Sequence, residues 1–184
     1  MIGLFVLVLL LAAFYGGARR GTSLQLVSVL GYLISFFFAV ANYQEIAKKI
    51  ELYVPYMSVT ADSKLKYYDM ELALDLDKAY YAAIAFVMVL FAGWLITKLV
   101  VIFADSLRYK RLRFLGGYDW AVAGVLNVIL MYINLYMFFM ILSMIPFATI
   151  QNLFETSGTA NFIVDQSPIL SDYFYRLWIT DVIG

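Results

Sequence analysis

The two side chains that carry out most enzyme and metal chemistry are missing from this chain. None of its 184 residues is a cysteine or a histidine, which excludes thiol nucleophiles, disulfides, serine–histidine pairs and cysteine-based metal sites. The densest group of carboxylates is Asp69, Glu71, Asp75 and Asp77, which lacks the central glycine of a calcium loop. This acidic run forms either a solvated face or an oxygen site for a divalent cation. We predict no enzyme activity, no cofactor and no metal centre.

Polar side chains recur at helical spacing inside otherwise apolar stretches. Ser28 and Ser35 are seven residues apart with Gly31 between them, and Asn127 and Asn134 repeat that spacing later. Seven residues make about two helical turns, so each set lies on one face of a helix. Small and hydroxyl residues favour close helix contacts, and carboxamides avoid lipid tails. These faces are either packing seams between helices or the polar wall of a solute path.

Lys98 is the ionisable residue that lies well inside an apolar stretch, with Trp94 one turn earlier on the same face. A lysine near the end of a membrane helix can extend its ammonium group to the lipid headgroups. The alternative is a buried charge that pairs with Asp105 or Asp119. A third interpretation is a residue for proton or substrate transfer.

These side chains are carried by four apolar stretches. About 20 apolar residues cross the ~30 Å hydrocarbon core of a bilayer, where backbone groups must be satisfied within their own helix. The chain is 64% hydrophobic with a mean hydropathy of +0.85, more than a soluble domain of this length could bury. We predict an all-α integral membrane protein with four transmembrane helices, over residues 2–17, 22–43, 80–104 and 120–145.

Positive charge is concentrated in two short connections. Arg19 and Arg20 follow the first span, and four basic residues lie between Arg108 and Arg113 after the third. In the long connection, five lysines are diluted by seven acidic residues. Lys and Arg in short loops mark the cytoplasmic side, so we predict that both termini, the long connection and the tail lie outside. The formal net charge of 0 gives no indication of nucleic-acid binding.

We expect residues 1–146 to form the transmembrane domain, with residues 44–79 as its extracytoplasmic loop. Residues 147–184 then form an amphipathic extracytoplasmic tail. Apolar residues recur at helical spacing from Gln44 onward, which predicts that the second span continues as an amphipathic helix interrupted by Pro55.

Two other outer segments have readable patterns. Residues 69–77 alternate between apolar and polar side chains as a strand does, but they are mostly good helix formers. We predict a two-turn helix there, leading into the third span. The tail has a predicted turn at residues 157–159 and a second amphipathic helix after Pro168.

The first helix boundary carries a family resemblance. The segment Gly17-Ala-Arg-Arg-Gly21, with the residues that follow it, resembles the N-terminal signature of the colicin V production protein (CvpA) family. Arg20-Gly21 matches the Arg-Gly turn of that family, whereas Thr22 replaces the usual aromatic residue and the usual Asn-Arg of the second half is absent. The other matching elements are Leu24-Gln25-Leu26, Gly31, Glu45–Lys49, Leu115-Gly116-Gly117, Gly124 and Ser167–Ser171.

The resemblance implies a small bacterial inner-membrane protein that supports the production or export of a peptide toxin and is linked to envelope homeostasis. It carries over no catalytic residue, and it makes Arg20, Gly21, Gly31, Gly116, Gly117 and Gly124 turn and packing positions. The expected partners are the lipid bilayer, other copies of the chain and an export or envelope protein.

Two other functional classes stay open. One is a small oligomeric transporter or channel with a polar path lined by Ser28, Ser35, Asn127 and Asn134. The other is a scaffold subunit of a larger machine. Hydrated Ser and Asn faces would favour a path, and dry, packed faces would favour a scaffold.

Overall fold

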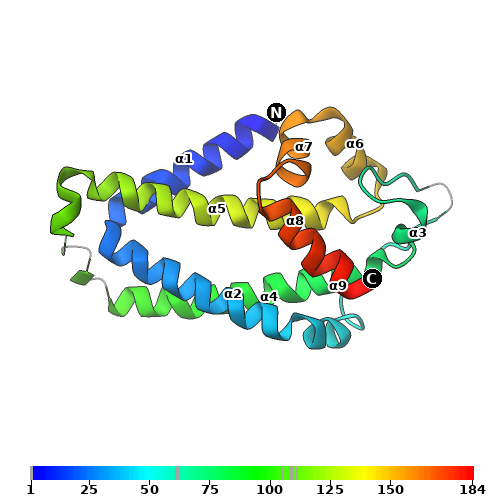
Figure 1. Cartoon of the computed structure of the whole chain (residues 1–184), viewed down its shortest axis with the longest axis horizontal. Coiled ribbons are helices and arrows are strands. Elements are labelled where there is room, and N and C mark those ends of the chain that lie inside the picture. Colours follow the sequence, from blue (N-terminus) through cyan, green and yellow to red (C-terminus); the bar gives the residue numbers. More distant parts are fainter. Residues whose placement is uncertain (1, 61–62, 105, 108–109, 111) are drawn as a thin grey trace. The chain divides into compact units, whose positions relative to one another are not determined.

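The computed structural model describes residues 2–60, 63–104, 106–107, 110 and 112–184. Four charged residues of the connections lie outside the described residues, namely Asp62, Asp105, Arg108 and Arg111. The described chain is helical throughout its regular elements (Figure 1), and its long helices are α1 (Ile2–Arg20), α2 (Thr22–Ile50), α4 (Leu76–Phe103) and α5 (Asp119–Ser143). The short elements are α3 (Met70–Ala73), η2 (Arg113–Tyr118), α6 (Ala148–Thr156), α7 (Gly158–Asp165), α8 (Leu170–Tyr175), η3 (Arg176–Thr180) and α9 (Asp181–Ile183).

The four long helices confirm the predicted all-α membrane fold. Each is long and apolar enough to cross a bilayer, the last one when counted from Leu115. Large apolar side chains point outward on them, including Phe5 on α1, Phe37 on α2 and Ile102 on α4, which are 59%, 68% and 68% exposed. Apolar surface of this extent needs lipid as its solvent.

The outer segments contain helices, as predicted, but the two-turn helix is a single turn and the turn predicted at residues 157–159 is reduced to Ser157. α2 continues beyond the predicted span to Ile50 and ends in a turn before Pro55. Residues 70–73 form the single turn of α3, and α4 then begins at Leu76, so this segment is helical but broken. In the tail, Ser157 separates α6 from α7, and its side chain accepts a hydrogen bond from the N–H of Ala160.

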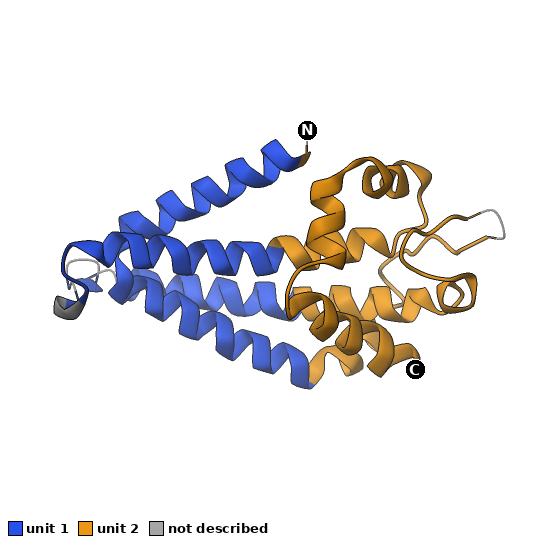
Figure 2. Cartoon of the chain, turned by 45° about the horizontal axis from the view of Figure 1, so that its top comes forward, with its two compact units in different colours: residues 1, 3–41, 88–134 blue, residues 2, 42–87, 135–184 orange. Residues whose placement is uncertain are grey.

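The chain divides into two compact units (Figure 2). Apart from the first two residues, unit 1 comprises residues 3–41 and 88–134, and unit 2 comprises residues 42–87 and 135–184. Helices α2, α4 and α5 therefore contribute residues to both units. This grouping by contact differs from the expected division at residue 146, which stays a prediction about where the membrane domain ends.

Unit 2 has an aromatic core that holds the C-terminal tail. Trp178 is fully buried, with its ring centroid 5.6 Å from that of Phe86 on α4 and 4.8 Å from that of Phe174 on α8. The hydroxyl of Tyr43 on α2 donates a hydrogen bond of 2.8 Å to the carbonyl of Leu177. The predicted amphipathic tail thus buries its apolar face within its own unit.

The central loop and α6 are joined by a hydrogen-bonded cluster within unit 2. The buried Gln151 donates to the carbonyls of Ser143 and Ile145 at 3.1 and 2.8 Å and accepts from the N–H of Lys66 at 3.1 Å. The hydroxyl of Tyr68 lies 3.0 Å from that of Ser143. Because Lys66 and Tyr68 contact residues 85 and 75 positions further along the chain, the loop is a folded part of the unit.

Candidate binding cavity within unit 1

The two basic connections of unit 1 meet each other. Gly21 joins α1 to α2 with φ = 76°, a left-handed conformation that favours glycine. The next residue, Thr22, donates from its hydroxyl to the carbonyl of Asp119 at 2.7 Å and from its N–H to the Asp119 carboxylate at 3.3 Å. Ser23 also donates to the carbonyl of Lys110. These contacts place the N-terminus of α2 beside the N-terminus of α5.

Two hydrogen bonds of carboxamide side chains connect three helices next to this junction. Gln25 on α2 donates from Nε2 to Oδ1 of Asn127 at 3.1 Å, and Asn127 donates from Nδ2 to the carbonyl of Ala13 on α1 at 2.6 Å. The helices approach closely here, because a Cβ added to Gly17 would lie 2.5 Å from the carbonyl oxygen of Ala123. Asn127 therefore faces the bundle interior, where its polar groups find partners.

α2 and α4 are held together by a reciprocal contact between small and hydroxyl residues. A Cβ on Gly31 would collide with the side chain of Thr97, and a Cβ on Gly93 would collide with that of Ser35. The hydroxyl of Ser35 donates to the carbonyl of Gly31 at 2.7 Å, and that of Thr97 donates to the carbonyl of Gly93 at 2.8 Å. Ser35 and Gly31 thus lie in a packing seam and line an otherwise apolar groove on the two helices.

A cavity of about 290 Å³, lined by both polar and apolar side chains, lies among all four long helices of unit 1. It brings together four of the predicted residues, Ser28, Lys98, Asn127 and Asn134, and also contains the family-matched Arg20. Ser35 and Gly31 do not line it. The remaining lining residues are Leu9, Ala12, Ala13, Tyr32, Trp94, Thr97, Leu130 and Met131.

The charge in this cavity is positive. The ammonium group of Lys98 lies 5.0 Å from the centre of the Trp94 ring, and Arg20 lines the same cavity. Within the described residues neither cation forms an ion pair, and no carboxylate lines the cavity. Asp119, one of the two expected partners of Lys98, is bonded to Thr22 instead. Asp105, the other, lies outside the described residues.

Several hydroxyl and amide groups in the lining are bonded to their own helix. Ser28 donates to the carbonyl of Leu24 at 3.5 Å, and Asn134 donates from Nδ2 to the carbonyl of Leu130 at 2.7 Å. The hydroxyl of Tyr32 is buried and approaches Asn134 without a hydrogen bond of normal geometry. Of these groups, the Tyr32 hydroxyl is the hydrogen-bond donor that stays available in the cavity wall.

The remaining family-matched glycines have distinct structural roles. Gly116 interrupts η2 with φ = 52°, which favours glycine, and Gly117 has open space where a Cβ would stand. Gly124 on α5 lies against the ring of Phe14 on α1. Gly116 thus lies in a turn and Gly124 in a helix contact, whereas no contact of Gly117 with the described residues requires a glycine.

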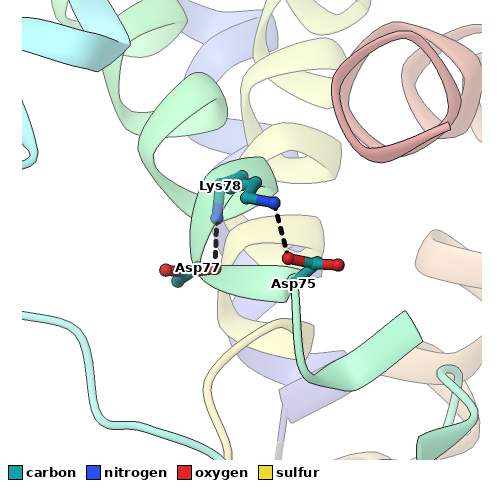
Figure 3. A network of polar contacts seen from close by, with 3 residues as sticks. All are labelled: Asp75, Asp77 and Lys78. Atoms are coloured by element: carbon teal, nitrogen blue, oxygen red, sulfur yellow. Dashed lines mark hydrogen bonds and ion pairs between the residues drawn. The ribbon is translucent and has the colours of Figure 1, made fainter. Parts of the chain in front are cut away.

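The acidic run forms the exposed approach to α4 (Figure 3). The ammonium group of Lys78 lies 2.6 Å from the Asp75 carboxylate, and the Lys78 N–H donates to Asp77 at 2.8 Å. In the part of the chain that the structure describes, no three carboxylates gather into a site that could hold a metal ion. Asp75 and Asp77 thus interact with a neighbouring lysine on the surface.

Four residues of this region were not predicted as site residues from the sequence. Gln25 and Tyr32 are seven residues apart on α2, the same spacing that singled out the serines, and Gly93 and Thr97 are four apart, as Gly31 and Ser35 are. Both pairs were therefore visible as spacing signals. Their partners were not, because spacing gives the face of a helix and not the neighbour that it meets.

Four apolar membrane helices around a polar cavity define a multi-pass α-helical membrane protein. Comparison with known families makes this specific: the family described as colicin V production protein matches residues 2–168. The chain belongs to that family, as the sequence resemblance predicted. It is 28% identical, over 192 aligned positions and 97% of both chains, to a protein of Bacillus subtilis (strain 168) described as uncharacterized transmembrane protein YshB. No solved structure matches the chain.

Proposed function

We propose that this chain is a non-enzymatic protein of the bacterial cytoplasmic membrane that supports peptide-toxin production or export and envelope homeostasis by binding. The observation that carries this proposal is the cavity of unit 1, where the described residues offer polar and positively charged groups but no paired acid and base. General acid–base or nucleophilic catalysis needs such a positioned pair. The family description names toxin production and no reaction.

The proposal includes an orientation with both termini outside. Arg19 and Arg20 lie in the same unit as the connection between α4 and α5, and Ser23 and Thr22 bond directly to Lys110 and Asp119. Basic residues that share one end of a helix bundle mark its cytoplasmic side. The central loop and the tail would then lie in the extracytoplasmic space, where a folded unit 2 can meet an export or envelope protein.

A small oligomeric transporter or channel is the second candidate. One observation favours it: Ser28, Asn127 and Asn134, three of the four residues expected to line a path, face one cavity. The fourth, Ser35, is 7% exposed and packs against Gly93. Transport would require this cavity to open to both sides of the membrane.

Cysteine labelling separates these functions, because the chain has no native cysteine. Single cysteines at Ser63 and Ser106 report the orientation, and a membrane-impermeant maleimide should label Ser63→Cys in intact cells and Ser106→Cys only in inverted vesicles. Ser28→Cys reports on the cavity, with Ser35→Cys in the packed seam as the matched control. A binding cavity should react at position 28 from the cytoplasmic side alone. Reaction from both sides would replace the binding role by transport.

The cellular role is tested by deleting the gene and complementing it. We expect the deletion to lower the export of a peptide toxin or to raise sensitivity to detergents, and complementation to restore both. Arg20→Gln combined with Lys98→Gln should complement poorly at normal protein levels, because the cavity loses its charge. Unchanged toxin export and envelope integrity in the deletion strain would refute the proposed function.

A further inference from the structure

The cavity of unit 1 holds two positive charges that no protein group neutralises within the described residues. Arg20 ends α1 and Lys98 lies on α4, and both line the cavity together with Asn134. A charged side chain on a membrane helix is unfavourable unless it is compensated by an opposite charge or by water. The Trp94 ring attracts the ammonium group of Lys98 but does not cancel its charge. An anion in the cavity would compensate both cations.

The hydrogen-bonding capacity of the wall points to the same class of ligand. Guanidinium and ammonium groups are donors only, and the buried hydroxyl of Tyr32 has no hydrogen bond of normal geometry. Asn134 uses one N–H on the carbonyl of Leu130. Ser28 and Thr97 already donate to their own helix backbones. The donors that remain suit an oxyanion.

The size and position of the cavity suit a phosphate group. A volume of about 290 Å³ corresponds to about ten waters at ~30 Å³ each, which is enough for a phosphate with part of an attached alcohol. Basic pockets between membrane helices on the cytoplasmic side bind phospholipid headgroups. A guanidinium fork beside an ammonium group also matches the geometry of phosphate oxygens.

We propose that Arg20 and Lys98 bind a phosphate group in the cavity of unit 1, either in the headgroup of an anionic phospholipid or in a small phosphate ester. This inference rests on the proposed function in taking the cavity as a binding site at the cytoplasmic side of the membrane. It does not depend on toxin export, so the two can fail separately. Arg20 would hold two phosphate oxygens, and Lys98 and the Tyr32 hydroxyl would donate to the others.

Binding to the purified, delipidated full chain in detergent micelles tests this proposal. The probes are phosphatidylglycerol, zwitterionic phosphatidylcholine, glycerol 3-phosphate and inorganic phosphate, and the readouts are native mass spectrometry for the lipids and phosphorus NMR line broadening for the soluble ions. We expect an anionic probe to bind and Arg20→Gln or Lys98→Gln to weaken it about tenfold or more, the loss of one charge-assisted hydrogen bond.

Two controls keep the result interpretable. Arg19→Gln removes the neighbouring, exposed guanidinium that does not line the cavity, and it should leave binding unchanged. Lys98→Arg keeps the charge and should retain binding. A loss in Lys98→Gln alone then follows from the missing charge, whereas a loss in both variants indicates a disturbed fold. Preference for phosphatidylglycerol alone identifies a lipid ligand, and binding of glycerol 3-phosphate or inorganic phosphate identifies a soluble one. Equal binding of both lipids with no soluble ion bound, or an equal loss in Arg19→Gln, would overturn the proposal.

Discussion

Replacing Gly17 by alanine tests the close contact between α1 and α5 that the structure places beside the cavity. The new Cβ would lie 2.5 Å from the carbonyl oxygen of Ala123 and 2.6 Å from the Cβ of Asn127. Neither atom can rotate away, because one belongs to the helix backbone and the other is fixed to it. Ordinary contact begins near 3.4 Å, so the two helices must separate by about 0.9 Å, the difference between 3.4 and 2.5 Å.

This separation has two energetic consequences. Overpacking of a tight contact costs about 1–3 kcal/mol. The 2.6 Å hydrogen bond from Asn127 to the carbonyl of Ala13 would lengthen as well, and an interhelical bond of this kind contributes about 0.6 kcal/mol. Alanine also favours the helix over glycine by about 0.5–1 kcal/mol, which offsets the weakened bond. We therefore expect Gly17→Ala to lower the free energy of unfolding by about 1–3 kcal/mol, which is a roughly 5- to 140-fold shift in the folding equilibrium at 1.4 kcal/mol per tenfold.

The adjacent glycine provides a matched control. The nearest atom to a Cβ on Gly16 is the side-chain nitrogen of Asn127 at 3.8 Å, an ordinary contact distance, so Gly16→Ala should raise stability by about 0.5–1 kcal/mol, the helix preference of alanine over glycine. Unfolding can be followed by tryptophan fluorescence during titration of sodium dodecyl sulfate into mixed micelles. Equal stabilities of the two variants would refute the close packing of α1 on α5.

Three further predictions concern unit 2. Burial, with a smaller effect of Asp165, raises the pKa of Tyr67 to about 12, so its contribution to stability is fully present below the unfolded pKa near 10 and is lost as the pH rises through 12. Alkaline unfolding should therefore show this loss, and Tyr67→Phe should reduce it, with tyrosinate absorbance as the probe. Asp75→Asn should leave thermal stability unchanged, because the ion pair with Lys78 is exposed and screened; a large loss of melting temperature would contradict this. Ile169 is a β-branched residue at φ = 68° and is 81% exposed, so Ile169→Gly should raise stability by about 1 kcal/mol in a thermal melt, whereas a decrease would mean that its backbone is not strained.

The membrane helices could be predicted from the sequence because their cause is local. Hydropathy adds up along a contiguous stretch, and the backbone inside a bilayer has no alternative to a helix. The turn at Gly21 could be predicted for a similar reason. A glycine next to two arginines indicates a helix boundary from local sequence alone, independently of tertiary packing. The family signature also lay in these short local elements.

The different surroundings of Ser28 and Ser35 could not be predicted from the sequence. The two serines lie on one face of α2, about 10 Å apart along its axis at 1.5 Å per residue, yet the first lines the cavity and the second packs against Gly93 on α4. Packed helices cross at an angle, so one stripe meets different neighbours at different heights. Spacing determines the stripe, and only the arrangement of all four helices determines its neighbours.

The sequence by itself therefore determined four helices, their short basic connections and the absence of histidine and cysteine chemistry. The tertiary structure decided which polar groups meet. Asp119 accepts a hydrogen bond from Thr22, and Lys98 and Arg20 line the same cavity. In unit 2 it brought Lys66 to Gln151 across 85 positions of the chain. These contacts depend on long-range packing, in which each side chain takes the partner that the surrounding helices leave within reach.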